Sequence, residues 1–245
     1  MIALFKKEFK SMFVSPMGYS VIAAYFFLNA ILFIFGVIFM EKTSDLTGYF
    51  SNIILFVVLI ISVLSMKFFS EERKNKTDQL LLTSPVSLFS IVFAKFLSGL
   101  SVFAIASAAT LTFLIPVAIF GDPDYLLILN SYLGLFLMGA AMIAICVFIS
   151  SLTQSSVVCA IVSLLVFMLV FLYGYIYSYI INFFSTSAPA IEAAVRNFLA
   201  VFMLYSKYVY FTSGLLDIPS VVYYISIIAV FLFLTVMTLE KRRWS

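Results

Sequence analysis

The sequence from residue 125 to residue 191 reads YLLILNSYLGLFLMGAAMIAICVFISSLTQSSVVCAIVSLLVFMLVFLYGYIYSYIINFFSTSAPAI, and these 67 consecutive residues include no charged side chain. A helix rises about 1.5 Å per residue and crosses a bilayer in about 20 residues, so this length exceeds one span. The polar cluster SSLTQSS at 150–156 divides the stretch. The stretch therefore predicts two membrane-spanning helices, at 126–149 and 157–182.

The composition of the whole chain also indicates a bilayer environment. Of its 245 residues, 64% are apolar and only 10% are charged, and the mean hydropathy is +1.20. Ordinary soluble domains carry about 25% charged residues, so a soluble enzyme, a nucleic-acid-binding protein and a disordered chain are excluded. The chain has no His and two Cys, both in apolar runs, which excludes His-based catalysis and a disulfide framework. We expect no catalytic, cofactor-binding or metal-binding residue in this chain.

The remaining charge-free stretches predict four further spans, at 17–40, 48–69, 92–120 and 218–239. The expected fold is thus an all-α integral membrane protein, one transmembrane domain over 1–245 with six transmembrane helices. Eleven basic residues fall in the segments on one side of such a bundle and three on the other. By the positive-inside rule this asymmetry predicts a multi-pass protein of the inner (cytoplasmic) membrane with both termini in the cytoplasm. The eleven are Lys6, Lys7, Lys10, Lys67, Arg73, Lys74, Lys76, Lys95, Lys241, Arg242 and Arg243, and the three are Lys42, Arg196 and Lys207.

The first fifteen residues have the pattern of an amphipathic helix. Five apolar residues at helical spacing form one face, and three lysines form the other. This pattern predicts an interfacial helix at 1–15 that lies on the cytoplasmic leaflet and contacts membrane lipid, followed by a turn at Ser15-Pro16. The alternative is a simple basic flank that only fixes topology. The apolar residues are Ile2, Phe5, Phe9, Met12 and Phe13, and the lysines are Lys6, Lys7 and Lys10.

The segment between the second and third spans reads FFSEERKNKTDQLLLTSPVSLFSIVFAK over 68–95. Its charged start is followed by an apolar triplet at 80–82 and a break at Ser84-Pro85. The spacing of Glu72 to Lys76, and of Lys74 to Asp78, allows ion pairs on a helix. A short charged helix with an apolar tip is suited to docking into a groove of another protein. A solvated loop is the alternative, but it would leave the leucines exposed to water.

This segment resembles the corresponding part of ABC-2 type transporter permeases. The resemblance rests on Glu71, Glu72, Thr77, Gln79, Leu80, Leu81, Leu82, Thr83, Pro85, Val86, Ser87 and Lys95. The start IALFKKEFK at 2–10, SPMGY at 15–19 and GLLD at 214–217 are most similar to the gliding-motility-type branch. Two positions depart from the family pattern: Lys76 stands where a Gly is usual, and Gln79 stands where many relatives carry Glu.

The resemblance implies a coupling helix at 71–87 that contacts a separate ATP-binding subunit. The chain has no G-x-x-x-x-G-K-[ST] loop, so ATP and Mg would be bound by that partner. The family organisation further implies two ABC ATPase subunits and a second permease subunit, identical or homologous. The residues expected to couple to the ATPase are Glu71, Glu72, Arg73, Thr77, Gln79, Leu80, Leu81, Leu82, Thr83, Pro85 and Val86.

The outer segment at 187–214 is too apolar for an exposed loop. Ser187 and Pro189 are typical of a helix start, and the apolar run 198–205 suggests a helical segment that re-enters the outer leaflet. The resemblance implies an outer gate here, whereas an interfacial helix without a gating role is the alternative. The gate residues would be Glu192, Arg196, Phe198, Phe202, Gly214 and Asp217.

Taken together, these patterns predict the membrane-spanning permease subunit of an ATP-driven ABC-2 type exporter. No ionisable residue lies in the middle of a span, which argues against ion-coupled secondary transport. The chain itself is not expected to be an enzyme, because a partner would hydrolyse the ATP. The alternative is a non-transporting membrane scaffold that recruits a cytoplasmic partner.

Overall fold

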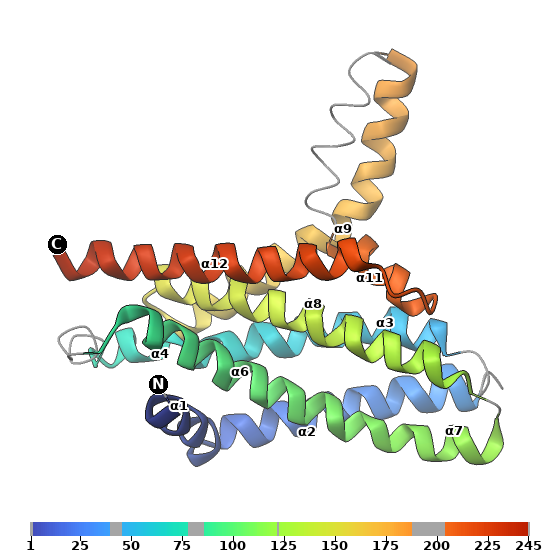
Figure 1. The fold of residues 1–245 in the computed structure, drawn as a ribbon, viewed down its shortest axis with the longest axis horizontal. Helices are drawn as coiled ribbons and strands as arrows, with labels where there is room; N and C mark the ends of the chain where they lie inside the picture. The colour runs from blue at the N-terminus through green and yellow to red at the C-terminus, as the bar shows by residue number, and fades with distance from the viewer. Residues whose placement is uncertain (1, 40–45, 78–85, 122, 188–203, 245) are drawn as a thin grey trace.

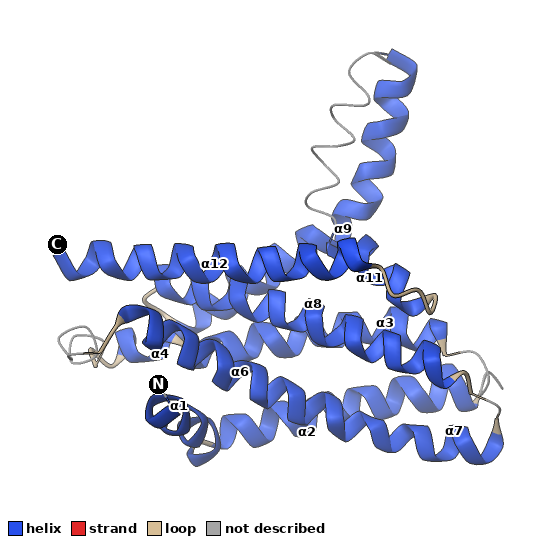
Figure 2. Cartoon of the chain, in the orientation of Figure 1, coloured by secondary structure: helices blue, strands red, loops and turns tan. Residues whose placement is uncertain are grey.

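The computed structural model describes residues 2–39, 46–77, 86–121, 123–187 and 204–244. Within these ranges the chain is helical and contains no strand (Figure 2). This agrees with the all-α fold expected from the sequence. Helices are the natural solution in lipid, because each backbone N–H and C=O finds its partner within the same segment.

Several helices begin near the starts of the expected spans. The third, fourth and fifth expected spans begin within a few residues of α6, α8 and α9, and the sixth begins with α12. The described elements are α1 (Ile2–Val14), α2 (Pro16–Phe33), the π-helix η1 (Ile34–Ile38), α3 (Thr47–Leu64), η2 (Ser65–Lys67), α4 (Phe69–Lys74), α6 (Leu88–Thr110), η3 (Leu111–Phe113), α7 (Leu114–Phe120), α8 (Tyr125–Leu152), α9 (Ser156–Ser187), α11 (Leu204–Thr212) and α12 (Ile218–Trp244).

Five helical stretches among the described residues are long and apolar enough to cross a membrane. They are Pro16–Ile38, Thr47–Lys74, Leu88–Phe120, Tyr125–Leu152 and Ile218–Arg243. The first part of α9, Ser156–Leu172, is a shorter apolar helix. Figure 1 shows the end of α9 pointing away from the bundle, while its start lies within it.

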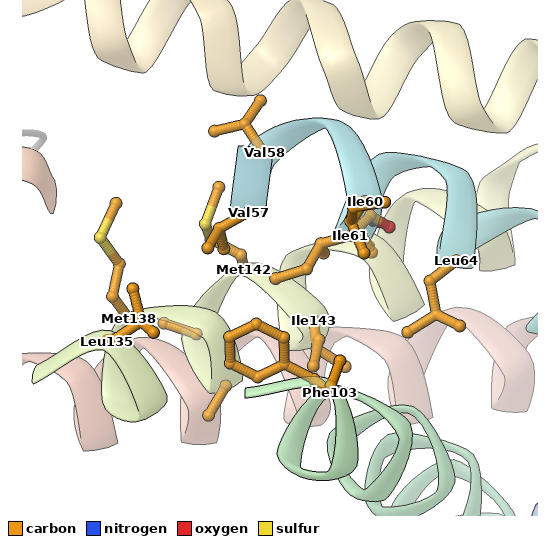
Figure 3. Packing of buried hydrophobic residues seen from close by; sticks show 14 of the residues in the cluster. Val57, Val58, Ile60, Ile61, Leu64, Phe103, Leu135, Met138, Met142 and Ile143 are labelled. Carbon is orange, nitrogen blue, oxygen red and sulfur yellow. Dashed lines mark hydrogen bonds between the residues drawn. The ribbon is translucent and has the colours of Figure 1, made fainter. Parts of the chain in front are cut away.

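The centre of the bundle is formed by α3 and α8, which are mostly buried, whereas few residues of α2 and α12 are fully buried. Figure 3 shows α3 residues Val57, Ile61 and Leu64 close to Met142 and Ile143 of α8. Phe103 of α6 lies next to Ile143 in the same view. The outward apolar faces of the peripheral helices are suited to lipid contact.

One glycine allows α6 and α8 to approach closely. A Cβ atom added at Gly139 of α8 would lie 2.2 Å from Cε1 of Phe103, so any larger residue would displace that ring. Phe103 is 1% exposed. Small residues at such crossings let membrane helices gain van der Waals contact, which is the main source of their association in lipid.

Both ends of the chain lie at the same end of the bundle (Figure 1). There α1 runs crosswise to α2 and packs against α6, and α4 and the end of α12 lie nearby. The turn after α1 is tight, with Pro16 at the start of α2 and Gly18 against the backbone of Met12. The expected N-terminal helix is therefore present, and its inward face consists of Leu4, Glu8 and Met12.

Candidate functional site

The helix α4 begins at a sharp break in the chain and is held there by α8. At Phe68 the backbone leaves helical geometry (ψ −114°), and its ring is fully buried against Gly99 of α6. The hydroxyl oxygen of Ser150 then accepts hydrogen bonds from the backbone N–H of Phe69 (2.8 Å) and of Ser70 (2.9 Å). These donors have no partner within α4, so Ser150 acts as an N-cap supplied by another helix.

Arg73, near the other end of α4, forms hydrogen bonds to the turn between α8 and α9. Its Nη1 donates to the carbonyl of Ser151 at 3.2 Å and to the carbonyl of Thr153 at 2.8 Å. The last carbonyls of α8 lack partners within that helix, and a cation near them is favourable. α4 is thus bonded through Ser150 and Arg73 to the end of α8 and the residue that follows it.

Lys95 of α6 joins α4 to α1. Its Nζ donates to Oε2 of Glu8 at 3.0 Å and to Oε1 of Glu72 at 2.8 Å, and its side chain is 1% exposed. The ammonium also lies 5.1 Å from the ring centroid of Phe69 and 3.5 Å from the carbonyl oxygen of Phe68. We refer to Glu8, Lys95 and Glu72 as the ion triad.

The ion triad contains two carboxylates and one ammonium, all shielded from solvent. Glu8 is buried, Glu72 is mostly buried, and one oxygen of Glu72, Oε2, has no hydrogen-bond partner in the described part of the chain. Buried ion pairs hold their partners firmly, because separating them leaves a charge without compensation. The triad therefore joins α1, α4 and α6.

The structure describes five of the expected coupling residues, Glu71, Glu72, Arg73, Thr77 and Val86. Glu71 pairs with Lys67 at 2.8 Å, and the Thr77 hydroxyl donates to the carbonyl of Glu72 at 3.2 Å. Val86 is partly buried against the apolar core. Gln79, Leu80, Leu81, Leu82, Thr83 and Pro85 lie outside the described residues.

The prediction of a helical ion pair between Glu72 and Lys76 is wrong. α4 ends at Lys74, and Glu72 bonds Lys95 instead. Lys76 adopts a left-handed conformation (φ +56°), and the turn is closed by bonds from Lys76 N–H to Arg73 C=O (3.1 Å) and from Thr77 N–H to Glu72 C=O (2.9 Å). This is a Schellman turn, which favours Gly at the position that Lys76 occupies.

At the opposite end of the bundle, Gly214 and Asp217 form the turn between α11 and α12. Gly214 ends α11 at φ +79°, and its carbonyl accepts from Asn130 Nδ2 of α8 at 2.7 Å. Asp217 caps α12, since its Oδ2 accepts from the Ser220 N–H (3.1 Å) and from the Ser220 hydroxyl. Both residues shape a turn that is bonded to α8. The other expected gate residues, Glu192, Arg196, Phe198 and Phe202, lie outside the described residues.

Sequence reasoning missed three residues of the site. Ser150 was visible only as part of the polar cluster between two spans, and Lys95 and Glu8 only as parts of the stretches that resemble the family. Glu8 and Lys95 are 87 residues apart, so no local spacing relates them. The usable signal was a single acidic residue on the inward side of an otherwise basic amphipathic helix. In the described ranges no group of three or more Cys, Asp or Glu side chains is placed to hold a metal ion.

Comparison with known proteins identifies a family. The model of a protein family described as ABC-2 family transporter protein matches residues 2–242, which is nearly the whole chain. No curated protein matches the chain.

Proposed function

The chain belongs to the ABC-2 family of transporter proteins, and on this premise we propose that it is the permease subunit of an ATP-driven exporter. Proteins of this family are membrane transport components and are not themselves catalytic. The energy would come from ATP hydrolysis by a separate subunit, because the chain has no P-loop. ATP and Mg would be bound by that subunit alone.

The observation that carries this proposal is the attachment of α4 to the spans. α4 begins the proposed coupling segment 71–87 and is bonded to α8 by Ser150 and Arg73, and to α6 by Lys95. A segment that only recruits a partner needs no such bonds. A segment that transmits movement needs them, because a displacement at its tip must reach the spans without being absorbed locally.

The proposed mechanism follows from these bonds. When two ATPase subunits close on ATP, they displace the docking tip at 80–86. The displacement passes through α4 to the end of α8 and the turn between α8 and α9. Since α8 lies at the centre of the bundle and contacts α3, α6, α11 and α12, its movement changes the packing of the whole subunit. Alternating closure of the two sides of the pathway would result.

We place this subunit in the inner membrane with six spans and both termini in the cytoplasm, α9 being one of the six. The location of α1, α4 and the end of α12 at one end of the bundle supports this orientation. A second permease subunit would complete the pathway, and the segment at 187–214 would form its outer gate. The similarity of 2–10, 15–19 and 214–217 to the gliding-motility-type branch leads us to propose membership of that branch.

The test is to purify the chain together with an ABC ATPase subunit from the same organism and measure ATP hydrolysis in liposomes. We expect no hydrolysis by the chain alone and hydrolysis by the complex. A double variant, Arg73→Gln with Ser150→Ala, should retain the ATPase but lower permease-dependent hydrolysis. A scaffold would give unchanged hydrolysis in the variant, and that result would overturn the proposal.

A further inference from the structure

The ion triad has one carboxylate more than its single ammonium requires. A buried cation needs one anionic partner, because leaving it unpaired is strongly destabilising. Lys95 has two, at 3.0 Å and 2.8 Å. One of the two can therefore leave without exposing an unpaired buried cation, and the remaining pair is electrically neutral.

The two carboxylates differ in how firmly they are held. Glu8 has a side chain that is 8% exposed, on a 13-residue helix that packs against α6 and α2. Glu72 has a side chain that is 21% exposed, on a helix of six residues, and its Oε2 has no hydrogen-bond partner in the described part of the chain. Glu72 is thus the more exposed carboxylate of the triad, and it is carried by the element next to the docking tip.

We propose that Glu8 is a positioning residue: it remains the counter-ion of Lys95 and so allows Glu72 to separate from Lys95 when α4 moves. This inference rests on the proposed function, in which α4 moves with the ATPase. With Glu8 present, separation leaves a neutral Lys95–Glu8 pair. Without it, separation would leave a buried cation alone, so α4 would stay bound to α6. The N-terminal helix thereby sets how easily the coupling segment moves.

The proposal predicts a change at α4 when only α1 is altered. A nitroxide spin label on Lys74→Cys reports the mobility of α4, since Lys74 is exposed at the end of that helix. Cys146 and Cys159 are replaced by Ala to leave one labelling site. The labelled chain is measured in liposomes without ATPase. Lys10→Gln is the matched control, because Lys10 is an exposed charge on the same helix.

We expect Glu8→Gln to reduce the mobile population of the label by about tenfold. In this variant the separation of Glu72 from Lys95 would leave the buried Lys95 cation unpaired, so α4 separates less often. Lys10→Gln should match the parent chain. A label that is unchanged or more mobile in Glu8→Gln would overturn the proposal, because a residue that merely supports α4 would loosen it when removed. If the wild-type chain retains no ATPase, the proposed function fails. The mobility of the spin label, which is measured without ATPase, still tests the role proposed for Glu8.

A double variant provides a second measurement. Glu8→Gln and Glu72→Gln should each leave one Lys95–Glu pair and unfold near the parent temperature in detergent. Together they leave Lys95 unpaired, so the double variant should unfold at a clearly lower temperature than the sum of the single effects gives. Additive single effects would overturn the proposal, because they would show that the carboxylates do not share Lys95.

Discussion

Arg73 and Ser150 cap each other's helices. Ser150, near the end of α8, accepts from the first N–H groups of α4, at 2.8 Å and 2.9 Å, while Arg73 of α4 donates to the carbonyls just after Ser150, at 2.8 Å and 3.2 Å. The first N–H groups of α4 and the last carbonyls at the end of α8 lack partners within their own helices, and both sets find hydrogen-bond partners at this one contact. Neither helix end is complete without the other, so the two helices are expected to move together.

The first prediction concerns Arg73. Arg73→Gln removes the charged donor to the end of α8 and should lower the free energy of unfolding by about 1–2 kcal/mol, in the range of hydrogen bonds to charged groups at a partly exposed site. Lys74→Gln, one residue later and exposed, should change it by less than about 0.5 kcal/mol. Denaturant titration in detergent measures both. Equal effects in the two variants would contradict the role assigned to Arg73.

The second prediction concerns Ser150. Ser150→Ala leaves two backbone donors of α4 without their acceptor and should cost about 1–2 kcal/mol. Ser151→Ala is the matched control, because among the described residues the Ser151 hydroxyl bonds only the Phe148 carbonyl of its own helix, at 2.7 Å. Trypsin added from the cytoplasmic side should cut after Arg73 and Lys74 faster in Ser150→Ala than in Ser151→Ala. The same cleavage rate in both would show that α4 does not depend on this cap.

The spans could be predicted from the sequence because their signal is local. Long runs without charge, such as 125–149, leave the helix as the only way to satisfy the backbone in lipid. The start of α4 could not be predicted, since neither Gly nor Pro marks Phe68. The break there depends on Ser150, about eighty residues away, and on the fit of the Phe68 ring against Gly99.

The site was only partly predictable for the same reason. Glu71, Glu72 and Arg73 stood out as a charge cluster, but the partners of Glu72 and Arg73 did not. A helical pair of Glu72 with Lys76 was the natural local expectation, and the long-range Lys95 displaced it. Gly214 and Asp217 were found from the family pattern, and the structure gives each a place in the turn after α11.

The third prediction uses the strained turn after α4. Lys76→Gly should raise the free energy of unfolding by roughly 0.5–1 kcal/mol, because Lys76 has a positive φ (+56°) that Gly adopts without strain. This net value already includes the opposing effect of the larger conformational entropy of Gly in the unfolded chain. Lys74→Gly, within α4, should lower it instead. Opposite signs in denaturant titration are expected. A loss of stability in Lys76→Gly would contradict the left-handed turn.

The fourth prediction concerns topology. A cysteine at Lys74 should react with an impermeant thiol reagent only from the cytoplasmic side, and a cysteine at Leu215 only from outside. Lys74 and Leu215 are both exposed, whereas Cys146 and Cys159 are buried and should stay unlabelled. Labelling of both positions from the same side would rule out the proposed orientation.

The central claim is that the segment at 71–87 binds an ATPase subunit, and Leu81→Asp tests it most directly. Burying a Leu side chain contributes about 1.5–3 kcal/mol, and an unpaired carboxylate in its place costs more, so affinity should fall at least about tenfold. Leu215→Asp makes the same change at an exposed position in the turn at the other end of the bundle. The measurement is retention of the ATPase by the purified chain, with membrane insertion checked in parallel. We predict loss of the ATPase in Leu81→Asp and full retention in Leu215→Asp, whereas wild-type retention by an inserted Leu81→Asp chain would contradict the account.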